Sequence, residues 1–176
     1  MKTLKTITRL SFIAIALFLV SCGDDDDDTY VPPTTAPTSA SYVTGKVDGA
    51  DFSTIIFGTS TAQCSKANPG PDQFITVFGG DLAANSITIG LSAVTTTGTY
   101  ELNQNTNSFC NYSAGSGEIA YATSAECNTA HGTVVVTYMD NVKIEGTFSF
   151  TGVNTEDCAG GTKTVTEGSF RGTFQQ

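Results

Sequence analysis

The chain has 176 residues, with 17 acidic against 8 basic side chains and a formal net charge of −9. Nucleic acids and anionic lipid surfaces are recognised through clustered Lys and Arg, so this balance excludes both as expected partners. The length suits one domain of ordinary size with flanking segments.

An export signal is predicted over residues 1–21. Lys2, Lys5 and Arg9 precede a largely apolar run from Leu10 to Val20, and none of these residues is acidic. A membrane-spanning helix needs about 20 apolar residues, so the run is too short to span and is typical of a signal that is removed. Removal leaves five basic residues against 17 acidic ones, a formal charge of −12.

The signal ends in Leu19-Val20-Ser21-Cys22, which resembles the lipobox of bacterial lipoproteins. A lipobox cysteine receives diacylglycerol and becomes the new N-terminus after cleavage. The resemblance implies acyl chains such as palmitate on Cys22, and two or more such chains hold a protein firmly on a membrane. An ordinary cleaved signal followed by an unmodified cysteine is the alternative.

Residues 22–41 are predicted to form a solvated tether. Five consecutive carboxylates repel one another and cannot be buried. They are Asp24, Asp25, Asp26, Asp27 and Asp28. Their position resembles the acidic export signal of surface-exposed Bacteroidota lipoproteins, which implies an outer-membrane lipoprotein exposed at the cell surface. A plain solubilising tether on the periplasmic side is the alternative. Thr29–Ser41, rich in Thr, Pro and Ser, predicts an extended spacer.

One β-rich domain is predicted over residues 42–176. Thr, Val, Ile, Phe and Tyr are abundant, and no window shows the apolar spacing of a helix. Val43–Val47 and Phe52–Phe57 flank Asp48-Gly49, which predicts a two-residue hairpin turn. Phe74–Phe78 is apolar at nearly every position, which predicts a central strand covered on both faces.

Further strands are predicted towards the C-terminus. The alternation from Ile87 to Ala93 indicates a half-buried strand. A short strand at Ile119–Ala122 follows, and Thr133–Met139 then turns at Asp140-Asn141 into another strand. The side chains of that strand expected to face inward are Val142, Ile144, Phe148 and Phe150.

The last strand predicts a β-bulge. Val165 has an odd number whereas Phe170 and Phe174 have even ones, so all three face inward only if the alternation slips. Glu167-Gly168 is the expected position, because Gly accepts the unusual backbone conformation there. About nine short strands with turn signals between them predict an all-β domain, either an antiparallel β-sandwich or a partly closed β-barrel.

Four cysteines remain in the domain: Cys64, Cys110, Cys127 and Cys158. An even number in a small exported domain indicates disulfides, with three possible pairings. We expect Cys110 with Cys127, which closes a short loop, and Cys64 with Cys158. A zinc site is the alternative, but no C-x-x-C spacing occurs and His131 is the single histidine.

No motif predicts a catalytic, cofactor or metal site. Several residues are weak candidates for a functional site, but each is better explained as an ordinary surface, turn or core residue. They are His131, the G-x-G-x-x-A match at Gly115–Ala120, the loops at Asn103–Asn107 and Glu156-Asp157, and Tyr100, Tyr112, Tyr121 and Tyr138.

Short motifs across the mature chain carry a further resemblance. They are Val43–Gly49, Gly98–Leu102, Ile144–Phe150 and Thr166–Phe170. With the lipobox and acidic run, they resemble an uncharacterised family of Bacteroidota surface lipoproteins that carry a β-rich domain of unknown function. The resemblance implies location and fold, and brings no active site with it; the four domain cysteines are not part of its pattern.

Three functions remain for the domain. The first is a non-enzymatic surface module that binds a protein or glycan partner, favoured because no catalytic set occurs and the tether suits display. The second is a lipocalin-like carrier of a small apolar ligand. The third is an extracellular hydrolase, which would need two carboxylates that converge in a cleft.

Overall fold

We describe residues 40–68, 70–115 and 119–175 of a computed structural model of the chain. They belong to the second of two compact units, Val31–Gln176. The predicted signal peptide, Cys22, the aspartate run and nearly all of the tether lie outside the described residues. Within the described ranges, no helix has the length and apolar character needed to cross a membrane.

Every regular element in the described residues is a β-strand. The strands are β1 (Tyr42–Val47), β2 (Ala50–Ser53), β3 (Ile55–Ile56), β4 (Thr59–Ser60), β5 (Gln63–Ala67), β6 (Phe74–Gly80), β7 (Ser86–Ser92), β8 (Gly98–Leu102), β9 (Phe109–Ala114), β10 (Ile119–Ala122), β11 (His131–Met139), β12 (Lys143–Asn154) and β13 (Thr162–Thr173). All strand pairs are antiparallel. The prediction of an all-β domain is therefore confirmed.

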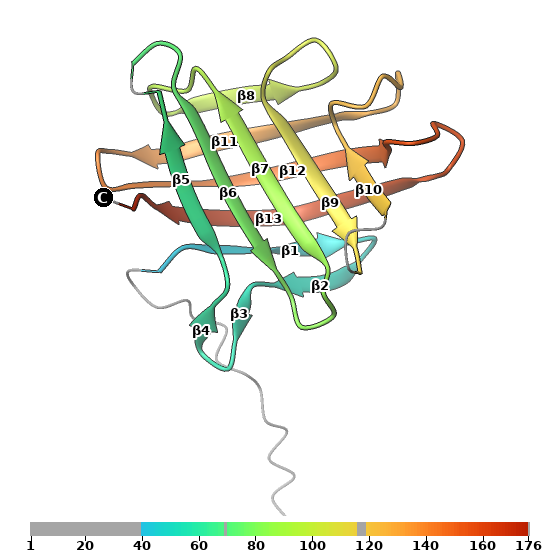
Figure 1. The fold of residues 1–176 in the computed structure, drawn as a ribbon, viewed down its shortest axis with the longest axis horizontal. Coiled ribbons are helices and arrows are strands. Elements are labelled where there is room, and N and C mark those ends of the chain that lie inside the picture. Colours follow the sequence, from blue (N-terminus) through green and yellow to red (C-terminus); the bar gives the residue numbers. More distant parts are fainter. Residues whose placement is uncertain (1–39, 69, 116–118, 176) are drawn as a thin grey trace, which may run out of the picture. The chain divides into compact units, whose positions relative to one another are not determined.

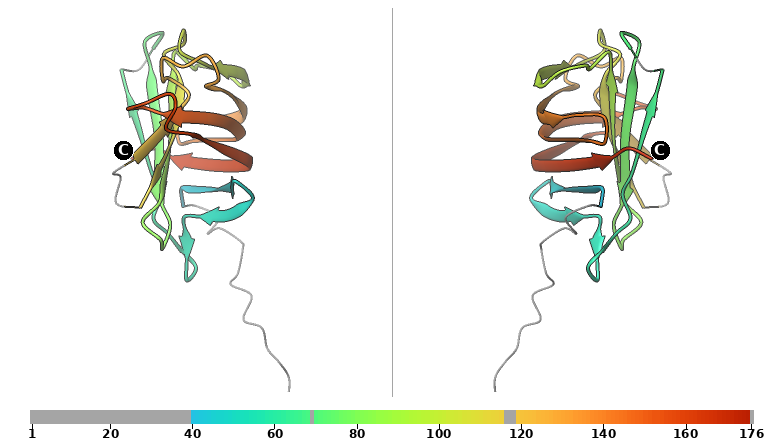
Figure 2. Two further views of the ribbon diagram at one scale, coloured as in Figure 1. Left: turned by 90° about the vertical axis from the view of Figure 1, so that its right-hand side faces the viewer. Right: turned by 90° about the vertical axis from the view of Figure 1, so that its left-hand side faces the viewer.

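The main sheet curls into two layers (Figures 1 and 2). Nine strands lie side by side in the order β2-β1-β13-β12-β10-β9-β7-β6-β5, and β11 and β8 extend from β12. The front layer of Figure 1 contains β5, β6, β7 and β9, and the back layer contains β1, β2, β8, β11, β12 and β13. Because β10 pairs with both β9 and β12, it joins the layers along one side. The result is a half-barrel.

The apolar core fills the space between the two layers. Side chains alternate along each strand, so each layer turns every second residue inward. The inward residues of the front layer include Ile75, Val77, Ile87, Ile89 and Leu91, and those of the back layer include Val43, Val134, Ile144, Val165 and Phe170, all fully buried. This packing leaves the opposite side of each layer to solvent.

The first predicted turn is confirmed, but the returning strand is β2, which ends at Ser53, and not Phe52–Phe57, because Ile55 and Ile56 pair with β4 in a separate sheet. Asp48 and Gly49 connect β1 and β2 with φ angles of 49° and 86°, the left-handed region that such a two-residue turn requires. The Asp48 carboxylate accepts hydrogen bonds from Nζ of Lys163 (2.8 Å) and from the backbone N–H of Thr164 (2.9 Å). These bonds fasten the turn to β13 and hold the pKa of Asp48 below its ordinary value.

The bulge in the last strand is confirmed as well. Phe148 pairs with Gly168 and Phe150 with Val165, so two residues of β13 oppose one of β12. Glu167 lies in this bulge with a φ of 53°. The slip turns Val165, Phe170 and the later apolar residues into the same core.

Replacement of Glu167 by glycine is expected to raise the free energy of unfolding by about 1 kcal/mol. A residue with a Cβ atom carries a conformational cost of roughly 1–2 kcal/mol in the left-handed region, whereas glycine does not. The exposed ion pair of Glu167 with Lys46 at 2.8 Å offsets little of this. Urea denaturation measures the change, with Lys46→Ala as the control for loss of the ion pair. A glycine variant less stable than Lys46→Ala would contradict the expectation.

Four apolar residues predicted to face the core do not, and one of them is Phe74, which lies on the outward side of β6. Val142 is 50% exposed because Asp140 Oδ1 accepts from the backbone N–H of Val142 and Lys143, which keeps Val142 in the turn. Phe78 is 44% exposed, since β6 has strands on both sides but solvent on one face. Ala93 follows the end of β7 and is exposed.

The predicted disulfide pairing is wrong. Cys127 and Cys158 form a disulfide, with Cα atoms 5.8 Å apart. Cys64 and Cys110 are buried free thiols. The observed bond follows from the topology: Tyr121 at the end of β10 pairs with Asn154 at the end of β12, so the loops after these strands, which contain the two bonded cysteines, lie together.

The two free cysteines lie in one row across the front layer. Cys64 pairs with Val77, Val77 with Ile89, and Ile89 with Cys110, so three strand spacings separate the thiols. That is roughly 14 Å, whereas bonded cysteines need Cα atoms within about 7 Å. Burial raises the pKa of the Cys64 thiol to about 12, and it also raises that of Cys110. Both are therefore unreactive core residues.

Candidate binding face

The weak site candidates of the sequence lie apart from one another. His131 is exposed at the start of β11, with Nδ1 2.7 Å from the carbonyl oxygen of Thr129. The side chains of Asn103 and Asn154 accept from nearby backbone N–H groups and shape their own loops. Among the described residues, no group of three or more His, Cys, Asp or Glu side chains could hold a metal ion.

The four tyrosines do not form a platform. Tyr112 and Tyr121 pack with ring centroids 6.4 Å apart beside the core. Tyr100 donates its hydroxyl to the carbonyl oxygen of Thr96, and Tyr138 is exposed on the back layer. The Gly115–Ala120 segment spans the connection from β9 to β10, of which residues 116–118 are outside the description.

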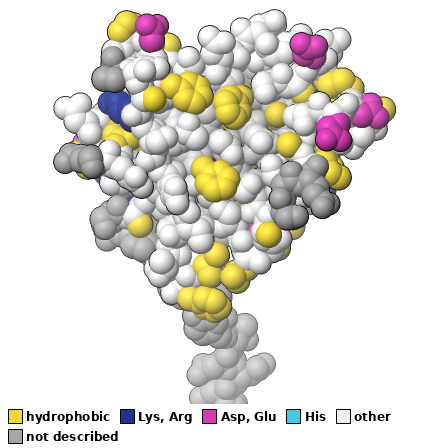
Figure 3. Space-filling model, viewed as in Figure 1, with side chains coloured by type: hydrophobic (Ala, Val, Ile, Leu, Met, Phe, Trp, Pro, Cys, Tyr) yellow, Lys and Arg dark blue, Asp and Glu magenta, His cyan; other side chains and the backbone are white. Residues whose placement is uncertain are grey.

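The most distinctive surface is the outward side of the front layer, which we call the front face. Its side chains are hydroxyls, amides, small residues and three phenylalanines, and none of them is charged. The front face consists of Gln63, Ser65, Ala67, Phe74, Thr76, Phe78, Gly80, Ser86, Thr88, Gly90, Ser92, Phe109, Asn111 and Ser113. Figure 3 shows this face with apolar side chains set in a polar surface and with charged side chains only at the rim.

Phe109 covers Gly90 on the front face. It pairs across strands with Gly90, and a Cβ on Gly90 would lie 2.8 Å from Cζ of Phe109, so the ring covers the glycine backbone. The ring of Phe74 lies beside it at a centroid distance of 6.4 Å and an interplanar angle of 31°. Two neighbouring rings therefore turn partly exposed faces to solvent.

Asn111 has an unsatisfied acceptor in the same face. It lies two residues along β9 from Phe109, in a row with Thr88 and Phe78. Its Oδ1 is shielded from solvent and has no hydrogen-bond partner. A buried acceptor without a partner costs about 1–3 kcal/mol, so the position is not explained by stability.

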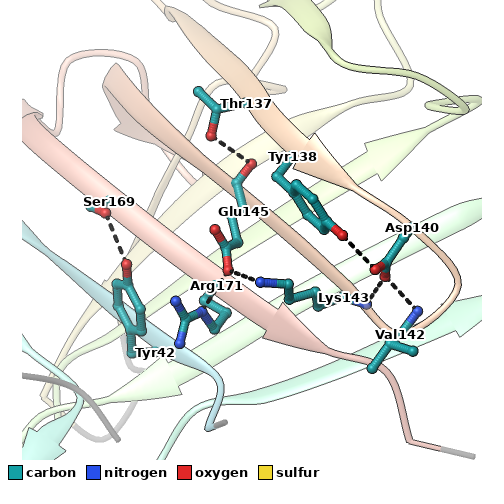
Figure 4. A network of polar contacts seen from close by, with 9 residues as sticks. All are labelled: Tyr42, Thr137, Tyr138, Asp140, Val142, Lys143, Glu145, Ser169 and Arg171. Atoms are coloured by element: carbon teal, nitrogen blue, oxygen red, sulfur yellow. Dashed lines mark hydrogen bonds and ion pairs between the residues drawn. The ribbon is translucent and has the colours of Figure 1, made fainter. Parts of the chain in front are cut away.

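The outer side of the back layer differs, because it carries paired charges (Figure 4). Glu145 on β12 accepts from Nζ of Lys143 at 2.7 Å and from Nε of Arg171 at 2.8 Å. The hydrogen bond from Lys143 is the largest cause, and with the contact to Arg171 it holds the pKa of Glu145 below its ordinary value. Close by, the Tyr138 hydroxyl donates to Asp140 Oδ2 at 2.7 Å. This side is stabilised by its own ion pairs and hydrogen bonds.

Glu145→Gln is expected to lower the free energy of unfolding at pH 7 by about 0.5–1 kcal/mol, because two partly exposed ion pairs are lost. A carboxyl group whose pKa is lower in the folded state stabilises the fold above its unfolded value, here 4.5, and this contribution disappears as pH falls through the folded value. Urea denaturation from pH 7 to pH 3 should show the two curves converging below pH 4.5. A difference that stays constant with pH would contradict the expectation.

The residues that form the fold and the front face match a known sequence family. The profile of DUF6252, a domain of unknown function, matches residues 50–173, more than half of the chain. The chain belongs to the DUF6252 family. No curated protein and no solved structure matches it significantly. The matched part of the DUF6252 domain contains all of β2 to β13, and therefore the whole front face.

Sequence reasoning missed the front face of the DUF6252 domain. The apolar residues of β6 suggested burial on both sides, which assigned Phe74 and Phe78 to a core. One signal was available: most outward positions of β5, β7 and β9 are Ser, Thr, Asn or Gln, and none of them carries a charge, in an acidic chain.

Proposed function

We propose that the chain is an outer-membrane lipoprotein, anchored through Cys22 and exposed at the cell surface, whose domain is a non-enzymatic binding module. The lipobox-like Leu19–Cys22 segment and the acidic run after it support the anchor and its orientation. The single observation that carries the binding role is the uncharged front face with partly exposed phenylalanine rings.

The front face supports binding better than the alternatives. A carrier of a small apolar ligand needs an internal cavity, but fully buried side chains from both layers occupy the interior of the described domain. A hydrolase needs two carboxylates in a cleft. One pocket is lined by two acidic residues, Asp51 and Glu167, but Lys46 lines it as well and its Nζ forms an ion pair with Glu167 at 2.8 Å.

The anchor is tested by intact mass of the protein extracted from membranes of its own host. The expected mass is that of residues 22–176 plus a diacylglycerol and an acyl chain, and Cys22→Ser is expected to lose both the adduct and the membrane association. A free thiol at the N-terminus of a processed chain would refute the anchor.

Surface exposure is tested by adding a protease to intact cells. The domain is expected to be shaved from cells, with a periplasmic protein as the control for envelope integrity. Replacement of the five aspartates from Asp24 to Asp28 by Ser or Asn is expected to leave the protein lipidated but protected. Full protection of the unaltered protein would place it on the periplasmic side.

A further inference from the structure

We infer that the front face binds a neutral glycan, with the Phe109 and Phe74 rings as its stacking platform. This inference rests on the proposed binding role of the face and names its class of ligand. The argument uses the geometry of the rings, the polar groups around them and the distribution of charge.

The rings are placed for stacking on a flat ligand. An aromatic face is electron-rich and attracts the C–H groups that one side of a sugar ring presents. The Phe109 ring occupies the space over Gly90, which has no side chain of its own there. Phe74 continues the surface at 6.4 Å. Such rings are rigid, so little conformational freedom is lost on binding.

The surroundings of the rings match a ligand rich in hydroxyl groups. Thr76, Thr88 and Ser92 on the face carry hydroxyls that both donate and accept, and Gln63 carries an amide. An apolar protein partner would bury these groups without hydrogen bonds, at a cost for each. Sugar hydroxyls would pair with them.

The absence of charge selects a neutral glycan. An anionic polysaccharide or a nucleic acid needs Lys or Arg at its site, and the front face has neither, in a chain whose net charge is −9. A face without ions also loses its water at a lower cost than a charged face would. Four strands of up to seven residues give roughly 15 by 20 Å, enough for several sugar units. A groove whose lining includes Ser92, Thr106 and the acidic residue Glu101 adjoins one end.

The test is affinity electrophoresis of the full lipidated chain, kept in a zwitterionic detergent without sugar, through gels that contain one polysaccharide each. Neutral probes are dextran, mannan, a β-1,4-glucan and xylan; alginate is the anionic probe. We expect retardation by at least one neutral probe and none by alginate. Phe109→Ala is expected to weaken the retarded complex about tenfold, as removal of a central contact does.

Two variants separate binding from folding. Tyr138→Ala removes an exposed aromatic ring from the back layer and is expected to leave retardation unchanged. Thr88→Val removes an outward hydroxyl of the front face with little change in side-chain shape, so it is expected to weaken binding without lowering the urea midpoint. A variant that weakened binding only by unfolding the domain would lower that midpoint.

The contrary outcomes are distinct. Passage through all four neutral gels, or retardation that Phe109→Ala leaves intact, overturns the glycan inference. A dimer in sedimentation that Phe109→Ala dissociates also overturns it, because the face would then be covered by a second copy. An unlipidated chain that still binds glycan would refute the anchor and leave this inference standing, so the two failures can be told apart.

Discussion

Replacement of Phe170 by alanine is expected to lower the free energy of unfolding by about 3–5 kcal/mol, the usual cost of emptying a large aromatic site in a core. Phe170 on β13 is fully buried, lies against Gly146 of β12 and packs on Phe148 at a centroid distance of 6.3 Å. The backbone is paired on both sides by β1 and β12, so the site collapses little. Domains of this size have a free energy of unfolding of about 5–15 kcal/mol, so the variant is expected to be only marginally stable.

Urea denaturation followed by circular dichroism measures this loss. Phe57→Ala is the matched control, because Phe57 is 80% exposed at the tip of the β3–β4 hairpin and its removal is expected to change stability by less than about 0.5 kcal/mol. A loss below about 1 kcal/mol for Phe170→Ala would mean that the two layers do not pack as described.

The double variant Cys127→Ser, Cys158→Ser is expected to have a free energy of unfolding about 3 kcal/mol lower than that of the wild-type protein. The disulfide joins residues 31 apart, and a cross-link over such a loop restricts the unfolded chain by about that much. It also holds the β10–β11 loop to the β12–β13 loop at the side where β10 joins the layers. Denaturation of the oxidised wild-type protein and the variant, both in urea, gives the difference.

The matched control is Cys64→Ala, which removes a thiol that forms no cross-link. Non-reducing peptide mapping is expected to recover Cys127 joined to Cys158, and thiol labelling is expected to reach Cys64 and Cys110 only after denaturation, since both are buried. Recovery of a peptide that joins Cys64 to any partner would contradict the structure, as would rapid labelling of the folded protein.

Local sequence patterns predicted much of the fold. Asp48-Gly49 specifies its turn because few residue pairs tolerate two successive left-handed conformations, and the parity of Val165 against Phe170 locates a bulge because side chains alternate strictly along a strand. Both features depend on a few neighbouring residues. Prediction was weaker for Phe78, whose surroundings depend on whether another layer covers that side of the sheet.

The candidate site could not be predicted in the same way. Phe109 and Gly90 are 19 positions apart in sequence, and only the pairing of β7 with β9 lays the ring on the glycine. Phe74 joins them from a third strand. A surface made from four strands has no motif in one segment, because each strand contributes one residue in two to it.

By itself, the sequence determined the all-β class, the first hairpin turn, the bulge and the expectation of an exported, lipid-anchored chain, since each depends on composition or on residues close together in the chain. The tertiary structure alone decided which cysteines are bonded and which face is exposed. Strand order places Cys64 and Cys110 in one row three strands apart, and brings Cys127 next to Cys158. Distances between remote segments depend on how the sheet is ordered and curled, and hydrophobic alternation carries no information about strand order.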